Sequence, residues 1–149
     1  MSKATKALYR RAWQELMNQR NLAIVDELFA PNYVLHDPHA PLTGREALAR
    51  FTTALHQGFS DLRLTLDDLL AEGDRVVQRF TLTGTHTGNF LGLSPCGRRL
   101  TLTGLALGRI TYGQIVEEWR GADWLSWYQQ LGLVLEPMLD KHTSKGVMP

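Results

Sequence analysis

A long antiparallel hairpin is the feature of this sequence that most constrains its fold. Between residues 99 and 120, apolar and polar side chains alternate on both sides of Tyr112-Gly113. A period of two indicates strands with two chemically different faces, and the dipeptide indicates the turn between them. Gly104 and Gly108 interrupt the first strand, where glycine is expected only if the sheet bends sharply or another group approaches closely. We therefore expect a strongly curved sheet that encloses something.

The second strand of this hairpin leads into a final helix. Its apolar positions are Ile115, Val116 and Trp119, which lie among Gln114, Glu117 and Glu118. A helical pattern then spans residues 124–131 and ends at Gly132. Asp123 lies just before that pattern, at the point where a curved sheet would meet the helix that closes it.

Three helical patterns precede the strands. The first spans residues 6–18, and the second spans residues 22–29 and is ended by Pro31. A short strand over residues 33–38 follows. Thr43 and Glu46 then have the spacing of a capping box, which predicts the start of a third helix. The buried side of that helix is predicted to consist of Leu48, Phe51, Leu55 and Phe59.

Strands dominate the chain after the third helix. Residues 62–67 and 76–85 alternate between apolar and polar side chains, so together with the hairpin they give at least four successive antiparallel strands. Strands that follow three helices predict an α+β fold. The glycines and proline between residues 86 and 99 indicate a loop. We expect one domain over residues 1–136 and a flexible tail over residues 137–149.

The charge balance excludes several classes of partner. The 149 residues carry 16 basic and 15 acidic side chains, for a formal net charge of +1, so neither nucleic acid nor a membrane surface is expected as a partner. No apolar run approaches the roughly 20 residues that span a bilayer, and residues 1–13 lack the apolar core of a secretory signal. We therefore expect a cytoplasmic protein. Cys96 is the single cysteine and cannot form an internal disulfide.

Four segments together resemble a known family. They are NYVLHDP, GTHTGNFLGLSPCGRR, GQIVEEWRGAD and the terminal QQLG. In this order they resemble the SnoaL-like polyketide cyclase or ester cyclase group of the nuclear transport factor 2-like superfamily, over about residues 6–132. The resemblance implies a conical barrel in which a strongly curved, mixed and mostly antiparallel sheet wraps around three N-terminal helices. It also implies a deep pocket at the wide end.

Three residues are candidates for catalysis. Asp123 resembles the acid/base aspartate of the polyketide cyclases, and its alternative role is the N-cap of the last helix. Asp37 occupies the place of the proton-shuttling aspartate of the related ketosteroid isomerases, and its alternative role is an Asp-Pro turn. His86 shares the inward parity of Phe80 on its strand, and its alternative role is a hydrogen-bonded structural histidine. His36 should face away from Asp37.

Some positions depart from the patterns of the related enzymes. Trp13 and Ala106 stand where the isomerases place a tyrosine and a second acid, so steroid isomerisation is disfavoured. Leu105 and Leu107 lie where the cyclases have a histidine. Limonene epoxide hydrolases need an Asp-Arg-Asp arrangement, for which only Arg109 and Asp123 are candidates; an epoxide hydrolase therefore ranks third.

Two functional hypotheses rank above an epoxide hydrolase. The first is a cofactor-independent, cyclase-type enzyme that carries out acid/base chemistry, of the aldol or isomerase type, on a hydrophobic carbonyl compound. The alternative is a protein that binds a small hydrophobic molecule without transforming it. Both would use a pocket lined by Trp13, His36, Phe51, Phe80 and Trp119. The histidines lack a recognised metal spacing, so neither a metal nor a cofactor is expected.

The outer face of the sheet predicts a homodimer. Helices can cover only the concave side of such a sheet, and Val77, Leu105 and Leu107 remain on the other side. Threonines at neighbouring positions make this face only partly apolar.

Overall fold

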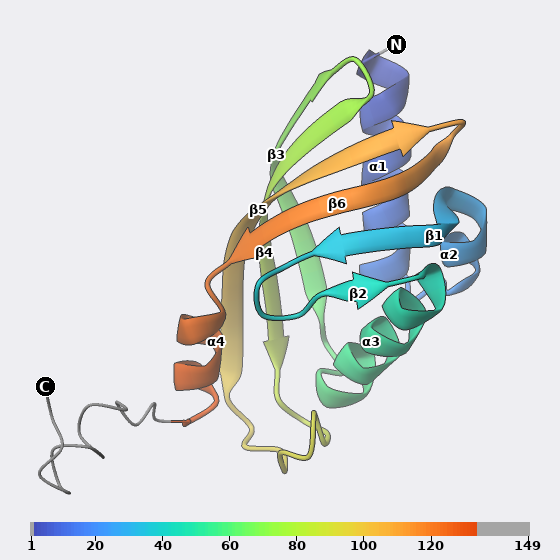
Figure 1. Ribbon diagram of the computed structural model, residues 1–149. Coiled ribbons are helices and arrows are strands. Elements are labelled where there is room, and N and C mark those ends of the chain that lie inside the picture. The colour runs from blue at the N-terminus through green and yellow to red at the C-terminus, as the bar shows by residue number, and fades with distance from the viewer. Residues whose placement is uncertain (1, 134–149) are drawn as a thin grey trace, which may run out of the picture.

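Six strands form one mixed sheet in the computed structural model, which describes residues 2–133. The elements in chain order are α1 (Ser2–Met17), α2 (Ala23–Leu28), β1 (Phe29–His36), β2 (Leu42–Thr43), α3 (Arg45–Gly58), β3 (Arg63–Glu72), β4 (Arg75–Thr85), β5 (Arg99–Thr111), β6 (Gln114–Ala122) and α4 (Trp124–Gln130). The strand order is β2-β1-β6-β5-β4-β3 (Figure 1). Neighbouring strands are antiparallel except β1 and β6, which are parallel. The predicted α+β fold with a mixed, mostly antiparallel sheet is therefore confirmed.

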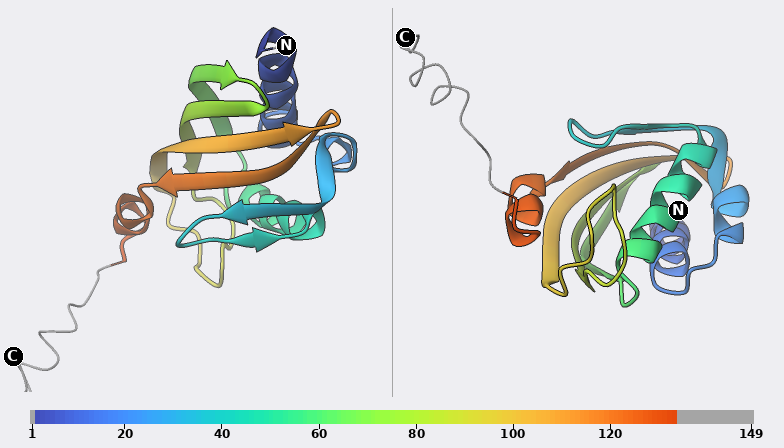
Figure 2. Two further views of the ribbon diagram at one scale, coloured as in Figure 1. Left: turned by 45° about the horizontal axis from the view of Figure 1, so that its top comes forward. Right: turned by 90° about the horizontal axis from the view of Figure 1, so that it is seen from below.

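The sheet is strongly curved, and helices α1 and α3 lie on its concave side (Figure 2). Helix α1 has apolar residues at helical spacing, so one face of it can be buried against the sheet. The buried residues of that face are Tyr9, Ala12, Trp13, Leu16 and Met17. They join side chains from α3 and from the inner face of the sheet in one hydrophobic core.

Two glycines of β5 allow other groups to approach the sheet closely. A Cβ atom on Gly108 would lie 2.5 Å from the ring of Tyr9, and one on Gly104 would lie 2.8 Å from the ring of Phe80. Either distance is far below van der Waals contact, so a side chain at these positions would displace the aromatic ring. Of the two explanations expected for Gly104 and Gly108, a sharp bend of the sheet or a close approach, the close approach is found at both positions.

The start of α3 differs from the prediction. Thr43 lies in β2, where it pairs with Val34 of β1, and Gly44 is the N-cap residue with no side-chain hydrogen bond. The capping box of Thr43 and Glu46 is therefore wrong, although the helix itself is confirmed. The strand pairing continues up to the helix, where Gly44 N donates to Tyr33 O, so Thr43 belongs to β2 and does not cap α3.

Strand β1 begins earlier than predicted and includes Pro31. The pairing of β1 with β6 is interrupted between Phe29 and Val34. A proline is tolerated there because its missing N–H removes no bond from a regular ladder. Pro31 therefore lies within an irregular strand and does not merely end the preceding helix.

A β-bulge in β6 reverses the expected orientation of its second half. Ile110 pairs with Ile115, whereas Arg109 pairs with Glu117, so Val116 is the extra residue. One extra residue moves every later side chain to the opposite face. Glu118 consequently lies on the buried side of the strand, and Trp119 lies on the outer side. The expectation that Trp119 faces the interior is wrong for this reason.

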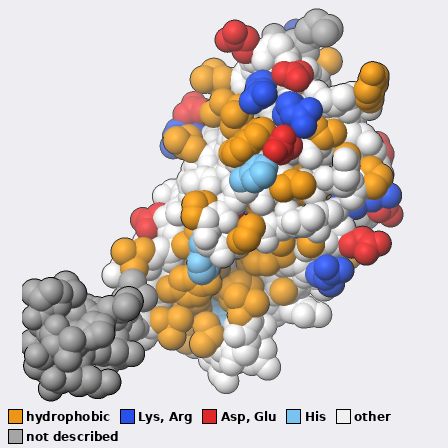
Figure 3. Space-filling model, viewed as in Figure 1, with side chains coloured by type: hydrophobic (Ala, Val, Ile, Leu, Met, Phe, Trp, Pro, Cys, Tyr) orange, Lys and Arg blue, Asp and Glu red, His pale blue; other side chains and the backbone are white. Residues whose placement is uncertain are grey.

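The outer face of the sheet exposes hydrophobic side chains between charged ones (Figure 3). Leu105 is 55% exposed and Val77 is 39% exposed, so both lie on this face as predicted. Trp119 packs on it between the ring of His36, at a centroid distance of 5.3 Å, and the guanidinium group of Arg75. No helix within residues 2–133 is long and apolar enough to cross a membrane. The predicted tail over residues 137–149 lies outside the described residues.

Candidate active site

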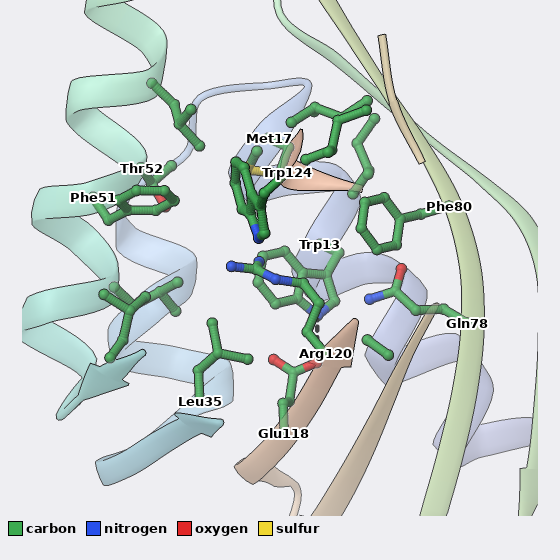
Figure 4. A pocket seen from close by; sticks show the side chains of 17 residues that line it. Trp13, Met17, Leu35, Phe51, Thr52, Gln78, Phe80, Glu118, Arg120 and Trp124 are labelled. Carbon is green, nitrogen blue, oxygen red and sulfur yellow. Dashed lines mark hydrogen bonds between the residues drawn. The ribbon is translucent and has the colours of Figure 1, made fainter. Parts of the chain in front are cut away.

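A narrow pocket lies between the concave face of the sheet and the helices (Figure 4). Its lining is mostly apolar and consists of Trp13, Met17, Leu35, Leu42, Leu48, Phe51, Thr52, Leu55, Leu64, Gln78, Phe80, Leu82, Leu102, Ala106, Glu118, Arg120 and Trp124. The space that admits the centre of a water molecule is about 40 Å³, which is room for a few waters. A ligand with several rings therefore requires the lining side chains to move apart.

Glu118 is a buried carboxyl group on the wall of this pocket. Its side chain comes from β6, and the residue is only 1% exposed. Tyr33 Oη donates a hydrogen bond to Oε1 at 2.7 Å, while Tyr9 Oη and Trp13 Nε1 donate to Oε2, the latter at 3.2 Å. Burial raises the pKa of Glu118, and these hydrogen bonds and the charge of Arg120 only partly oppose that rise.

The two tyrosines remain neutral donors to Glu118. Burial raises the pKa of Tyr9 and of Tyr33 well above the usual value, and the nearby charge of Glu118 raises both further. Gln78 Nε2 in turn donates to Tyr9 Oη at 2.9 Å. A chain of hydrogen bonds thus runs from Gln78 through Tyr9 to Glu118.

Arg120 brings a positive charge into the same pocket. Its guanidinium group reaches into the pocket from β6 (Figure 4) and lies 5.6 Å from the centroid of the Trp124 ring. The Nε atom donates to Asp37 Oδ2 at 2.8 Å. The Nη2 atom is buried and has no hydrogen-bond partner among residues 2–133.

Asp37 holds Arg120 in place. Its Oδ2 atom accepts from Arg120 Nε and from Trp124 Nε1, and its Oδ1 atom accepts from the backbone N–H groups of His39 and Ala40. Burial tends to raise the pKa of Asp37, but the hydrogen bonds from Arg120, His39 and Trp124 outweigh it and lower that pKa. Asp37 is therefore an ionised partner of Arg120.

Comparison with known proteins identifies the family of the chain. The profile of the family described as SnoaL-like polyketide cyclase matches residues 7–131. The chain belongs to this family. Aklanonic acid methyl ester cyclase DauD of Streptomyces sp. (strain C5) is 34% identical over 111 residues, which cover 73% of this chain and 67% of that protein. Aklanonic acid methyl ester cyclase DnrD of Streptomyces peucetius is 34% identical over 108 residues, which cover 71% of this chain and 72% of that protein.

Solved structures of other proteins are similar to this chain. TsrD from Streptomyces laurentii has a TM-score of 0.80 and 28% identity, with 90% of this chain and 99% of that chain covered. Wild-type IdmH from Streptomyces antibioticus has a TM-score of 0.70 and 32% identity, with 88% and 98% covered. The resemblance predicted from the four sequence segments is confirmed, as is the expectation of a polyketide cyclase-like enzyme.

The predicted acid/base residue of this SnoaL-like protein lies away from the pocket. Asp123 is exposed and is the N-cap of α4, where its Oδ1 atom accepts from Ser126 N at 3.0 Å. The alternative prediction of a cap is thus confirmed. Asp37 forms the predicted turn, but its carboxylate is taken up by four hydrogen bonds and does not line the narrow pocket.

His86 also lies outside the residues that line the pocket. It is buried, packs against Phe59 at a ring-centroid distance of 5.4 Å, and accepts from Cys96 N at 3.2 Å through Nδ1. This is the position of a hydrogen-bonded structural histidine, which was the alternative prediction for His86. The inward side predicted for His86 agrees with its burial, but the residue follows the end of β4 at Thr85 and lies beyond the residues that line the pocket.

The predicted binding residues divide between the two sides of the sheet. Trp13, Phe51 and Phe80 line the pocket. His36 and Trp119 stack on the outer side, where His36 Nε2 lies 2.6 Å from Glu117 Oε2. Arg109 also pairs with Glu117 there, so the structure does not bring Arg109 together with Asp123 as an epoxide hydrolase would require. Within residues 2–133, no group of three or more His, Cys, Asp or Glu side chains could hold a metal ion.

The sequence analysis missed Glu118, Arg120 and Gln78. One signal pointed to them: Gly108 and Ala106 are small, and they pair with Glu118 and Arg120 on the neighbouring strand. Small residues on the concave face leave space for the large polar side chains beside them. That signal becomes readable only when the register of the hairpin, including its bulge, is known.

Proposed function

We propose that this protein catalyses an intramolecular aldol closure of a hydrophobic carbonyl compound, with Glu118 as the acid/base group and Arg120 as the group that binds the carbonyl oxygen. The observation that carries the proposal is the joint presence of these two side chains in an otherwise apolar pocket. A buried carboxyl group with a raised pKa exchanges protons efficiently near neutral pH.

Each step can be assigned to one of these side chains. The Glu118 carboxylate takes a proton from the carbon next to a carbonyl group, and the resulting enolate oxygen is held by the guanidinium group of Arg120. The enolate carbon then forms a bond to a second carbonyl carbon of the same molecule. The new alkoxide takes the proton back from Glu118. No atom is gained or lost in this sequence, and it requires no cofactor.

The apolar lining supports a hydrophobic substrate, and Asp37 supports the role of Arg120. A guanidinium group held through its Nε atom keeps its outer N–H groups free for a ligand. The relatives DauD and DnrD are named for aklanonic acid methyl ester, so this compound is the first substrate to test.

The experiment compares two glutamates of the same strand. Glu118→Gln removes the titrating group in the pocket, and we expect its turnover of aklanonic acid methyl ester to fall by about 100-fold or more. Glu117→Gln removes a carboxylate that faces outward, and its turnover should stay within about twofold of the wild type. Equal losses in both variants, or full turnover in Glu118→Gln, would reject Glu118 as the acid/base group.

A binding protein is the second candidate, because most of the pocket lining is apolar. This candidate predicts that the wild type binds the ester and releases it unchanged. Detection of a cyclised product by mass spectrometry, at a rate that depends on enzyme concentration, would exclude it.

A further inference from the structure

Two polar atoms of the pocket lining lack hydrogen-bond partners among residues 2–133. They are Gln78 Oε1, an acceptor on β4, and Arg120 Nη2, a donor on β6. Gln78 is only 4% exposed, and both side chains end at the pocket (Figure 4). A buried polar atom without a partner costs about 1–3 kcal/mol. Such atoms in a pocket lining indicate the groups that a ligand has to supply.

The hydrogen bonds around Tyr9 determine which end of the Gln78 amide is free. The hydroxyl proton of Tyr9 is donated to Glu118, so the Tyr9 oxygen can only accept a further hydrogen bond. Gln78 must therefore turn its Nε2 toward Tyr9, as the 2.9 Å contact has it. The carbonyl oxygen of the amide is left as an acceptor beside the pocket.

We propose that the pocket selects a carbonyl compound that also carries a hydroxyl group, and that Gln78 is the residue that recognises this hydroxyl. The hydroxyl proton is donated to Gln78 Oε1, while the carbonyl oxygen accepts from Arg120. The contact between the carbonyl oxygen and Arg120 rests on the function proposed above. The contact between the hydroxyl group and Gln78 adds a substrate class to that function.

Other assignments fit the pocket less well. A protonated amine could also donate to Gln78, but it would bring a second positive charge into the apolar pocket that holds Arg120. Glu118 is a weaker choice for the hydroxyl, because its two oxygens already accept three hydrogen bonds. A neutral hydroxyl group at Gln78 satisfies the free acceptor without adding charge.

Three small ligands separate the two contacts. 6-Hydroxy-1-tetralone has both groups, 1-tetralone has only the carbonyl group, and 5,6,7,8-tetrahydro-2-naphthol has only the hydroxyl group. Their affinities can be measured through tryptophan fluorescence, because Trp13 and Trp124 line the pocket. We expect the wild type to bind the hydroxyketone about tenfold more tightly than 1-tetralone, which is the effect of one net hydrogen bond.

Variants at Gln78 test whether this side chain causes the preference for the hydroxyl group. Gln78→Met keeps most of the side-chain volume, and it should lose the preference for the hydroxyl group while keeping the preference for the carbonyl group. The retained carbonyl preference shows that the pocket is still folded. If Gln78→Met does not fold, Gln78→Asn withdraws the amide by one methylene group and should lose the same preference.

The outcomes distinguish the two proposals. A hydroxyl preference that is absent from the wild type, or that persists in Gln78→Met or Gln78→Asn, overturns the role of Gln78. Arg120→Met should lose the carbonyl preference and keep the hydroxyl preference. If Arg120→Met keeps the carbonyl preference, the proposed function loses its carbonyl-binding group, whereas hydroxyl selection by Gln78 still stands.

Discussion

Asp37→Asn tests whether the ion pair with Arg120 organises the candidate active site. Asparagine keeps the size of the side chain and can still accept from the backbone of His39 and Ala40. Its NH2 group, however, would face the N–H donors of Arg120 and Trp124, where the wild type has a carboxylate oxygen. The variant therefore loses two hydrogen bonds and leaves the Arg120 charge without this counter-ion.

The magnitude follows from the burial of the pair. The side chains of Asp37 and Arg120 are 1% and 15% exposed, and their closest atoms are 2.8 Å apart. Removal of one partner from a buried ion pair costs about 3–5 kcal/mol, because the remaining charge is left uncompensated. We expect Asp37→Asn to lower the free energy of unfolding by about this amount at neutral pH.

Urea unfolding at several pH values measures the effect. The pKa of Asp37 is lower in the folded protein than the ordinary 3.8, so its contribution to stability is complete well above pH 3.8. That contribution is lost as the pH falls through the folded-state pKa, where the carboxylate takes up a proton. The difference between wild type and Asp37→Asn should therefore shrink at low pH.

An exposed aspartate provides the control. Asp123→Asn keeps the side chain that caps α4, and asparagine caps helices about as well as aspartate, so its free energy of unfolding should change by less than about 0.5 kcal/mol. A change equally small in Asp37→Asn at neutral pH would refute the reasoning, since the pair would then contribute nothing to the fold.

Three further predictions concern packing, helix α3 and assembly. Gly108→Ala should cost about 1–3 kcal/mol in a urea melt, because the new Cβ atom would meet the Tyr9 ring; an unchanged midpoint would contradict the close approach. Phe51→Ala should cost only about 1–2 kcal/mol, less than a fully buried phenylalanine, because Phe51 is partly exposed at the pocket; a loss above about 4 kcal/mol would contradict this. We also propose that the outer sheet face around Leu105 and Val77, which is exposed, forms a homodimer; sedimentation of a monomer at micromolar concentration would reject it.

Local sequence patterns predicted most of the fold. The helices and the long hairpin each bury one face, so their periodicity is visible in the sequence itself. The glycines of β5 were informative for a different reason. A residue without a Cβ atom in a strand indicates that another group approaches the strand closely. The capping box failed because pairing of Thr43 with β1, which joins segments on both sides of a loop, outweighed the local preference.

The candidate site was harder to predict because it depends on one bulge. Without the extra residue Val116, the alternation in β6 favours Trp119 as the inward residue. Residue type favoured the same wrong prediction for Trp119, since tryptophan is usually buried and glutamate is rarely buried without partners. The partners of Glu118 come from α1 and β1, more than 80 residues away in the chain, and no local pattern connects them with it.

The pH dependence of turnover tests the central claim most directly. If Glu118 acts first as the base, it must be ionised, and its raised pKa moves the rising limb of kcat to a pH above 4.5, the ordinary value for glutamate. The residual turnover of Glu118→Gln should lack that limb, while Glu117→Gln should keep it unchanged. A rising limb that persists at the same pH in Glu118→Gln, with turnover close to that of the wild type, would contradict the assignment of Glu118 as the acid/base group.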